Sequence, residues 1–222
     1  MDDRRRLNRD GPQGSCAVMR LCVDALAAER GGRAVFSDLS FAVEAGTLLH
    51  VSGANGAGKT TLLRILAGLA AASAGSTQWQ RADSSLLAAE AACFVGHANA
   101  FNEALTVREN LAYAAALSAL NADSIAIVSA LDAFGVNTLV DRRFGTLSQG
   151  QRKRCSLARV LLDRRPRRRA WLLDEPFVAL DADTQTQLAA IIRTELSAGG
   201  LVIYSSHQAV EISAAHTQEV VL

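Results

Sequence analysis

Small residues and a Lys-Thr-Thr run stand together at positions 53–61 of the chain, in the order GANGAGKTT. Small side chains let successive backbone N–H groups curl around phosphate oxygens, and a Lys ammonium can reach the terminal phosphates of a nucleotide. A Thr hydroxyl directly after the Lys is placed to ligate the Mg²⁺ that accompanies such a ligand. The spacing therefore predicts a nucleotide phosphate loop with Thr60 as a metal ligand. Its residues are Gly53, Ala54, Asn55, Gly56, Ala57, Gly58, Lys59, Thr60 and Thr61.

The lysine of this loop is informative because the chain otherwise prefers Arg. Lys59 and Lys153 are the only lysines among 23 Lys and Arg residues. A compact ammonium suits a phosphate loop better than a planar guanidinium does. The alternative is a Gly-rich turn without a ligand. It is disfavoured because the loop follows an apolar run, TLLHVSG, and opens a helical one.

Two acidic residues end a second apolar run, AWLLD, at 170–174. Asp174 can hold Mg²⁺ through water, and Glu175 is placed to polarise an attacking water. This pair favours hydrolysis over phosphoryl transfer to a second substrate. The alternative is a solvated turn before Pro176. His207 follows a further apolar run, GLVIYSS, and either touches a terminal phosphate from the same sheet edge or is structural.

The segment TLSQGQRKR at 146–154 offers a separate site for an anion. Ser148 stands where a helix would begin, and the first backbone N–H groups of a helix have no partner within it. Such a helix start attracts negative charge. Because the nucleotide loop lies about 90 residues earlier, the residues alone do not say which anion this second site holds.

Strands and helices alternate along most of the chain. Apolar runs predict strands at 47–53, 92–97, 169–176 and 200–207, and helical spacing predicts helices up to 69 and over 106–135, 147–163 and 183–196. Short strands with turns at 31–32 and 45–46 are expected from 15 to 44. We therefore expect an α/β fold with an open core sheet, an N-terminal antiparallel β part and an inserted helical subdomain at about 76–163.

Length and composition indicate one compact unit, because 222 residues with 50% hydrophobic content bury one good core. We expect residues 1–15 to be a disordered leader and 16–222 to be the folded domain. No run reaches the roughly 18 apolar residues of a membrane span. Four cysteines without metal-ligand spacing are expected to be free thiols.

The charge balance argues against a nucleic-acid partner, since the formal net charge is only +1. One basic run, DRRPRRR at 163–169, could be a nucleic-acid patch. A run of this kind between a helix and a buried strand is more often a solvated loop.

Five motifs in order, GANGAGKTT, LSQGQ, LLDEP, ALD and SSHQ, make the chain from about 18 to 222 resemble an ATP-binding cassette (ABC) ATPase, which is a P-loop NTPase. The resemblance implies ATP and Mg²⁺ as ligands. It also implies that a second copy of the chain pairs head to tail and that the two copies enclose two ATP. In the family the LSGGQ-type signature of one chain faces the γ-phosphate held by the other.

Carried over to this sequence, the family pattern gives each motif residue a role. Ser148 and Gly150 would cap the ATP of the opposite chain, and Leu147, Gln149 and Gln151 would shape that turn. Asp181 of the ALD motif would cross the same interface. Glu175 would be the catalytic base, and His207 would be the switch histidine at the γ-phosphate.

Three positions depart from the family pattern. The usual third-position Gly of the signature is Gln149, which fits if its φ is not positive. The glutamine that normally links Mg²⁺ to the membrane subunit is His97, whose imidazole can make one hydrogen bond there. The position of the adenine-stacking aromatic holds Arg30. Its guanidinium either stacks on the base or is an ordinary exposed group.

The stretch FVGHANAFNEALTVRENLAYAAAL, together with LLDEPFVALD and SSHQ, resembles the ATPase subunits of haem exporters in bacterial cytochrome c maturation. This implies an ATPase on the cytoplasmic face of the inner membrane, held there by membrane-spanning subunits. It would power haem export or the release of a haem-delivery complex.

Three alternatives stay open. One is an ABC ATPase for another substrate, which its membrane partner would identify. Another is a non-transport ABC ATPase, a class that generally carries two cassettes or long coiled-coil insertions. The third is a P-loop kinase, which should lack the LSQGQ and ALD motifs.

Overall fold

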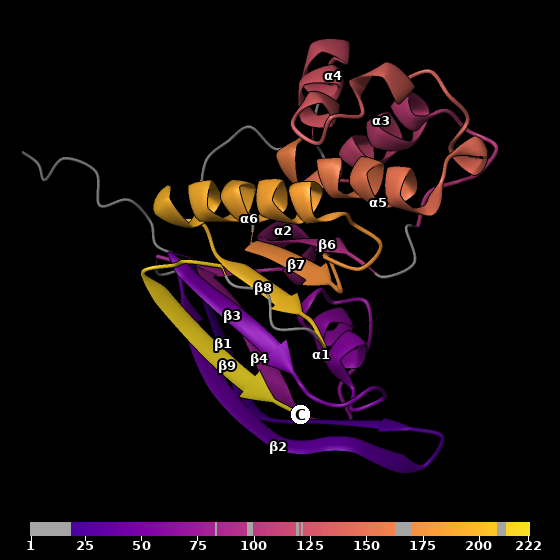
Figure 1. Cartoon of the computed structure of the whole chain (residues 1–222). Coiled ribbons are helices and arrows are strands. Elements are labelled where there is room, and N and C mark those ends of the chain that lie inside the picture. Colours follow the sequence, from indigo (N-terminus) through magenta and orange to yellow (C-terminus); the bar gives the residue numbers. More distant parts are fainter. Residues whose placement is uncertain are drawn as a thin grey trace, which may run out of the picture.

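The computed structural model describes residues 19–82, 84–96, 100–118, 120, 122–162, 170–207 and 212–222. Its named strands form two sheets (Figure 1). The antiparallel sheet has the order β2-β1-β4-β5 and consists of β1 (Met19–Arg30), β2 (Arg33–Glu44), β4 (Ala74–Arg81) and β5 (Ser84–Leu86). The parallel sheet has the order β6-β7-β8-β3-β9 and consists of β3 (Thr47–Ser52), β6 (Ala92–Val95), β7 (Ala170–Asp174), β8 (Val202–Ser205) and β9 (His216–Val221).

Helices lie on both faces of the parallel sheet. Helix α6 (Ala182–Ser197) runs along one face, and α1 (Lys59–Leu66) packs against the other. The other helical elements are α2 (Ala88–Ala91), α3 (Val107–Leu117), α4 (Ser124–Asp132) and α5 (Gln149–Leu157), with the 3-10 turns η1 (Asn137–Leu139), η2 (Phe144–Thr146) and η3 (Ala158–Leu161). Helices α3, α4 and α5 gather beyond α6, on the side away from the antiparallel sheet (Figure 1).

Two apolar clusters hold these layers together because alternate residues of a strand face opposite sides of the sheet. Leu172 and Ile203 pack with α1 and the antiparallel sheet, whereas Leu173 and Tyr204 pack with α6 and the helical region. Strands β7 and β8 are buried along their whole length. Their carboxyl ends, with that of β3 beside β8, lie at one sheet edge, where the polar residues of the predicted site follow.

The order of strands and helices confirms the predicted α/β fold with an antiparallel N-terminal part and a parallel core. The short strands predicted over 15–44 are wrong in length, since β1 and β2 have 12 residues each and turn at residues 31–32 as expected. The start of the helical stretch at about 76 is also wrong, because β4, β5 and the short helix α2 precede the strand predicted at 92–97, which is confirmed as β6. Trp79 anchors β4: it is 2% exposed, and its indole Nε1 donates to the backbone O of Leu66 over 2.9 Å.

Strand β9 is missing from the sequence prediction. Its sequence, HTQEVV, gives little apolar signal, since β9 is an edge strand with mostly exposed residues. The predicted leader at 1–15 and the basic run at 163–169 lie outside the described residues. Among the residues that the structure does describe, no helix combines the length and apolar character needed to cross a membrane.

Candidate active site

The phosphate loop between β3 and α1 has backbone torsion angles that require glycine at two positions. Gly53 has a φ of 138° and Gly58 a φ of 106°, both in the region that favours glycine. A Cβ at Gly58 would clash with Cγ1 of Val35, and one at Gly53 would lie 2.6 Å from the backbone O of Leu222. The tip of the loop, residues 54–56, is exposed. Close packing against Val35 and Leu222 therefore fixes one side of the loop, and its exposed tip is open to a ligand.

Lys59 begins α1 and is only 7% exposed. Its Nζ donates to the backbone O of Gly53 over 2.8 Å and of Ala54 over 3.1 Å. The ammonium therefore lies over the loop to which it belongs, where phosphate oxygens can take the place of these carbonyls. Thr60 is exposed and Thr61 half-buried on the same first turn.

Thr60 and Asp174 meet across the edge of the sheet. The Thr60 hydroxyl donates to Oδ1 and Oδ2 of Asp174 over 3.0 and 2.9 Å, and Asp174 is 1% exposed. The solvated turn considered for Asp174 is therefore excluded. The donor set is a hydroxyl and a carboxylate, and Mg²⁺ prefers such oxygen ligands with phosphates completing its shell. These residues fit that ion.

Glu175 and His207 come together beside this pair. His207 Nδ1 lies 3.1 Å from Oε2 of Glu175, whose side chain is only 14% exposed. Glu175 has a φ of 47°, a conformation that costs a non-glycine residue about 1–2 kcal/mol. This turn of the chain directs the carboxylate after β7 toward the residue after β8. The structure thus brings the two predicted catalytic groups into contact.

The predicted second anion site is an exposed helix start. Ser148 is the N-cap of α5: its Oγ accepts from Gln151 N over 3.3 Å, and Gln151 Oε1 accepts from Ser148 N over 3.0 Å. This capping box confirms that Gln151 shapes the turn. Because Ser148 Oγ accepts here, its O–H can donate to an anion. The Cβ that any other residue would add at Gly150 would lie 3.0 Å from the backbone O of Ala179, in the loop before α6.

Arg152 anchors the turn from behind. Its guanidinium donates to the backbone O of Leu147 over 3.0 Å and of Gly145 over 2.6 Å. It also pairs with Oε1 of Glu103 at 2.8 Å and lies over the ring of Phe144, 5.7 Å from the centroid. The segment before the signature is therefore tied to the loop that leads into α3.

The remaining predicted residues differ in what the structure says of them. Asp181 is the exposed N-cap of α6. Hydrogen bonds from the side chain of Thr184 and from its backbone N–H, the latter with N···Oδ1 of 2.8 Å, lower the pKa of the Asp181 carboxyl. Arg30 is the exposed last residue of β1. His97 lies outside the described residues. For these three, the predicted contacts to ATP or to the membrane subunit stay predictions.

Sequence reasoning missed two buried residues of the site. Ser205, at the end of β8, is fully buried; its Oγ accepts from Glu175 N over 3.0 Å and donates to Oδ1 of Asp174 over 2.8 Å. Lys153 is 4% exposed, and its Nζ donates to the backbone O of Asp174 over 3.3 Å. Burial lowers the pKa of Lys153 to about 8, although the carboxylates of Asp174 and Glu175 oppose that shift. The one sequence signal was that Lys153 is the second of only two lysines.

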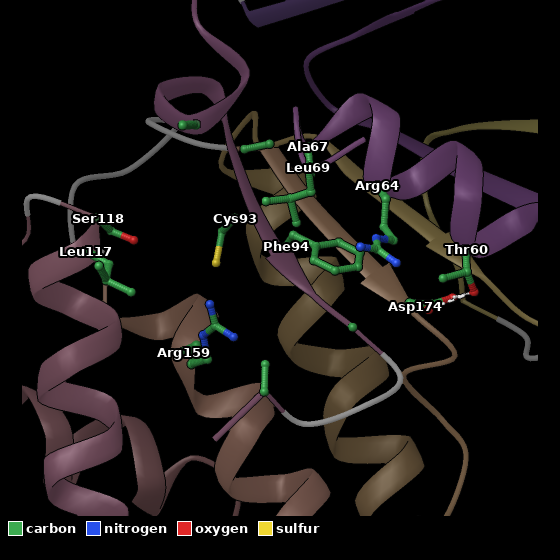
Figure 2. A pocket seen from close by; sticks show the side chains of 14 residues that line it. Thr60, Arg64, Ala67, Leu69, Cys93, Phe94, Leu117, Ser118, Arg159 and Asp174 are labelled. Atoms are coloured by element: carbon green, nitrogen blue, oxygen red, sulfur yellow. Dashed lines mark hydrogen bonds between the residues drawn. The ribbon is translucent and has the colours of Figure 1, made fainter. Parts of the chain in front are cut away.

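A pocket of about 720 Å³ opens next to the site (Figure 2). Leu117 of α3 lies on one side, Phe94 of β6 and Leu69 lie near the middle, and Arg64 of α1 lies on the other side. The far end is formed by Thr60 and Asp174, which also line the pocket. Two of its apolar residues are strongly exposed, Leu69 at 57% and Leu117 at 72%. The pocket therefore runs from an apolar rim, formed by Leu117 of α3 and by Leu69 after α1, to the Thr60–Asp174 pair.

One known family model spans most of these motifs. The family model described as ABC transporter matches residues 36–178, which include the phosphate loop, the signature turn, Asp174 and Glu175. This chain belongs to the ABC transporter family. As an ABC ATPase it binds and hydrolyses ATP, and the P-loop kinase alternative is excluded.

Curated ABC proteins match this chain over most of their own length and most of the chain. The cytochrome c biogenesis ATP-binding export protein CcmA of Albidiferax ferrireducens is 40% identical over 90% of this chain and 96% of its own. The protein of the same name from Cupriavidus necator is 42% identical over 84% of this chain and 82% of its own.

Solved ABC structures share the fold. An ABC transporter ATP-binding protein from Pyrococcus furiosus superposes with a TM-score of 0.76 at 24% identity, covering 90% of this chain and 96% of its own. The dimeric bacterial ABC cassette MJ0796 gives a TM-score of 0.73 at 19% identity, covering 85% and 88% of the two chains. The two-layered sheet arrangement is therefore that of an ABC cassette.

Proposed function

We propose that this chain is the ATP-hydrolysing subunit of an ABC export system that serves the biogenesis of c-type cytochromes. One observation carries the hydrolytic part: Glu175 and His207 meet at 3.1 Å, next to Asp174, which accepts from Thr60 in the first turn after the phosphate loop. A carboxylate at this place can orient and deprotonate water, and the imidazole can donate to a γ-phosphate oxygen.

Catalysis in this site is chiefly electrostatic positioning. The loop backbone and Lys59 hold the phosphates, and the Ser148 hydroxyl of a second copy of the chain would complete the cage around the γ-phosphate. When bound, Mg²⁺ neutralises charge that develops on the phosphates, and Thr60 and Asp174 would hold it, Asp174 through water. Glu175 then takes the proton of the attacking water.

The metal assignment predicts a specific effect of removing the Thr60 hydroxyl. Thr60→Val keeps the shape of the side chain and removes the oxygen, so the Mg²⁺ concentration that half-saturates hydrolysis should rise by about 10- to 100-fold. ATP binding measured in EDTA should change little. Thr186→Val, which removes an exposed hydroxyl on α6, is the matched control. An unchanged Mg²⁺ dependence would exclude Thr60 as a ligand.

We infer that membrane-spanning partners dock at the pocket beside the site. Its rim exposes apolar side chains of α3 and of the segment after α1, and its far end is formed by Thr60 and Asp174. Helix α3 buries Val107 and Leu111 in the core while it exposes Tyr113 and Leu117. A helix of a membrane subunit seated here would touch both the helical region and the metal-binding pair. That contact would hold the ATPase at the cytoplasmic face of the inner membrane.

The biological role is inferred from the relatives, whose printed names join cytochrome c biogenesis with ATP-binding export. By the resemblance of its motifs, we infer that the work done is haem export or the release of a haem-delivery complex. Deleting the gene for this chain should then abolish c-type cytochromes with covalently bound haem, as seen by haem staining of membrane fractions. Expression of the intact chain should restore them, and expression of the Glu175→Gln chain at the same level should not.

Normal haem staining in the deletion strain would contradict the role in cytochrome c biogenesis while leaving the ATPase assignment untouched. Copurification supplies an independent check on the partner. The intact chain, extracted from membranes in mild detergent, should bring down membrane-spanning subunits. Their identity separates this role from that of an ABC ATPase for another substrate.

A further inference from the structure

A buried lysine reaches the catalytic strand from the signature helix. Lys153 belongs to α5, whose first turn carries Ser148, and is 4% exposed. Burying an ammonium group is costly unless it is paired. Its Nζ donates to the backbone O of Asp174 over 3.3 Å, and that carbonyl belongs to the peptide that joins Asp174 to Glu175. The cation therefore acts on the link between the metal residue and the base.

The same peptide is held from its other side. Glu175 N donates to Oγ of Ser205 over 3.0 Å, and that hydroxyl donates to Oδ1 of Asp174 over 2.8 Å. Both polar atoms of the peptide are thus fixed, the oxygen by α5 and the nitrogen by β8. Glu175 has a φ of 47° at this point, which a free peptide would not prefer. Fixing the peptide holds the Glu175 carboxylate 3.1 Å from His207.

We propose that Lys153 is a positioning residue of the ATPase: its ammonium fixes the Asp174–Glu175 peptide and so keeps the Glu175 carboxylate aimed at the attacking water. The proposal rests on the assignment of Glu175 as the base and adds a group that reaches it from the signature helix. Since Ser148 caps the helix to which Lys153 belongs, α5 joins the turn that would cap ATP in one site to the base of the other.

Lys153→Met tests this assignment, because it keeps an unbranched side chain and removes the ammonium. We expect kcat for ATP hydrolysis to fall by about 10- to 100-fold, as for the loss of a hydrogen bond from a charged group. The KM for ATP should stay within about twofold, because Lys153 does not touch the phosphate loop in the described contacts. Lys153→Gln retains an N–H donor and should recover part of the lost kcat. Arg193→Met removes an exposed cation from α6 and should hydrolyse like the unmodified chain.

Two further measurements separate positioning from a merely structural role. The thermal midpoint of Lys153→Met should stay within about 4 °C of that of the unmodified chain, because the lost hydrogen bond and the relieved burial of a charge act in opposite directions. In a Glu175→Gln background, Lys153→Met should still form the ATP-dependent dimer. A Lys153→Met chain with unchanged kcat would overturn the proposal. A lower kcat would also overturn it if the variant lost dimer formation to the same extent or if its thermal midpoint fell well below that of the unmodified chain. Neither result changes the effect expected of the single variant Glu175→Gln, which tests the proposed function separately.

Discussion

Glu175→Gln should reduce steady-state ATP hydrolysis by at least about 1,000-fold, because an amide cannot take the proton of the attacking water. ATP binding should survive, since Glu175 follows β7 and is not part of the phosphate loop. The γ-phosphate then stays intact, and the variant should accumulate as a dimer that holds two ATP. Phosphate release and light scattering with ATP and with ADP measure the two effects.

Glu44→Gln is the matched control for this variant, because Glu44 lies exposed on β2 and pairs only with the Arg20 guanidinium at 3.8 Å among the ion pairs of the described residues. Surface pairs of this kind contribute little, about 0–1 kcal/mol. The control should hydrolyse ATP at the rate of the unmodified chain. If Glu175→Gln did the same, Glu175 would not be the base, and the contact with His207 would have to be structural.

Ser148→Arg should leave ATP binding to the isolated chain within about twofold and lower hydrolysis by at least about 100-fold. Ser148 is exposed and hydrogen-bonded only within its own turn in the described contacts, so its replacement does not disturb the phosphate loop of the same chain. The arginine side chain is larger than that of serine and would block the approach of a second chain to the γ-phosphate. Losing the N-cap would also destabilise α5 by about 1 kcal/mol.

Ser124→Arg makes the same substitution at an exposed Ser in the first turn of α4 and should hydrolyse ATP normally. Nucleotide binding is measured with a fluorescent ATP analogue, and hydrolysis by phosphate release. Loss of nucleotide binding in Ser148→Arg would mean that Ser148 acts within its own chain. Full hydrolysis would mean that the signature turn does not contact ATP at all.

The groups of the catalytic site were predictable because each lies in a short motif with its own local cause. The glycines at 53 and 58 are required by the loop backbone, Ser148 and Gln151 form a capping box, and Asp174 ends an apolar strand. Such signals depend on residues only a few positions apart. The meeting of Glu175 with His207 followed from placing two strand ends at the same sheet edge.

Features that depend on tertiary packing could not be predicted from the sequence. The role of Lys153 requires α5 to lie against the end of β7, and no local pattern fixes that distance. No strand was predicted between 76 and 91, because Trp79 is the only buried residue of β4 and its pairing in the antiparallel sheet leaves no alternating apolar pattern. The polar edge strand β9 is positioned by pairing with β3 rather than by its own composition. Backbone pairing of this kind leaves little trace in the residues themselves.

We propose that each ATP site is built from two chains, the phosphate loop of one and the Ser148 turn of the other. Mixing the Ser148→Arg chain with the Glu175→Gln chain before ATP is added tests it most directly, because each variant alone has no intact site. A mixed dimer has one site with an intact base and an intact signature turn. Hydrolysis should therefore reappear in the mixture and reach at most about a quarter of the unmodified rate, the value for fully random pairing. A mixture as inactive as its two components would contradict the shared site.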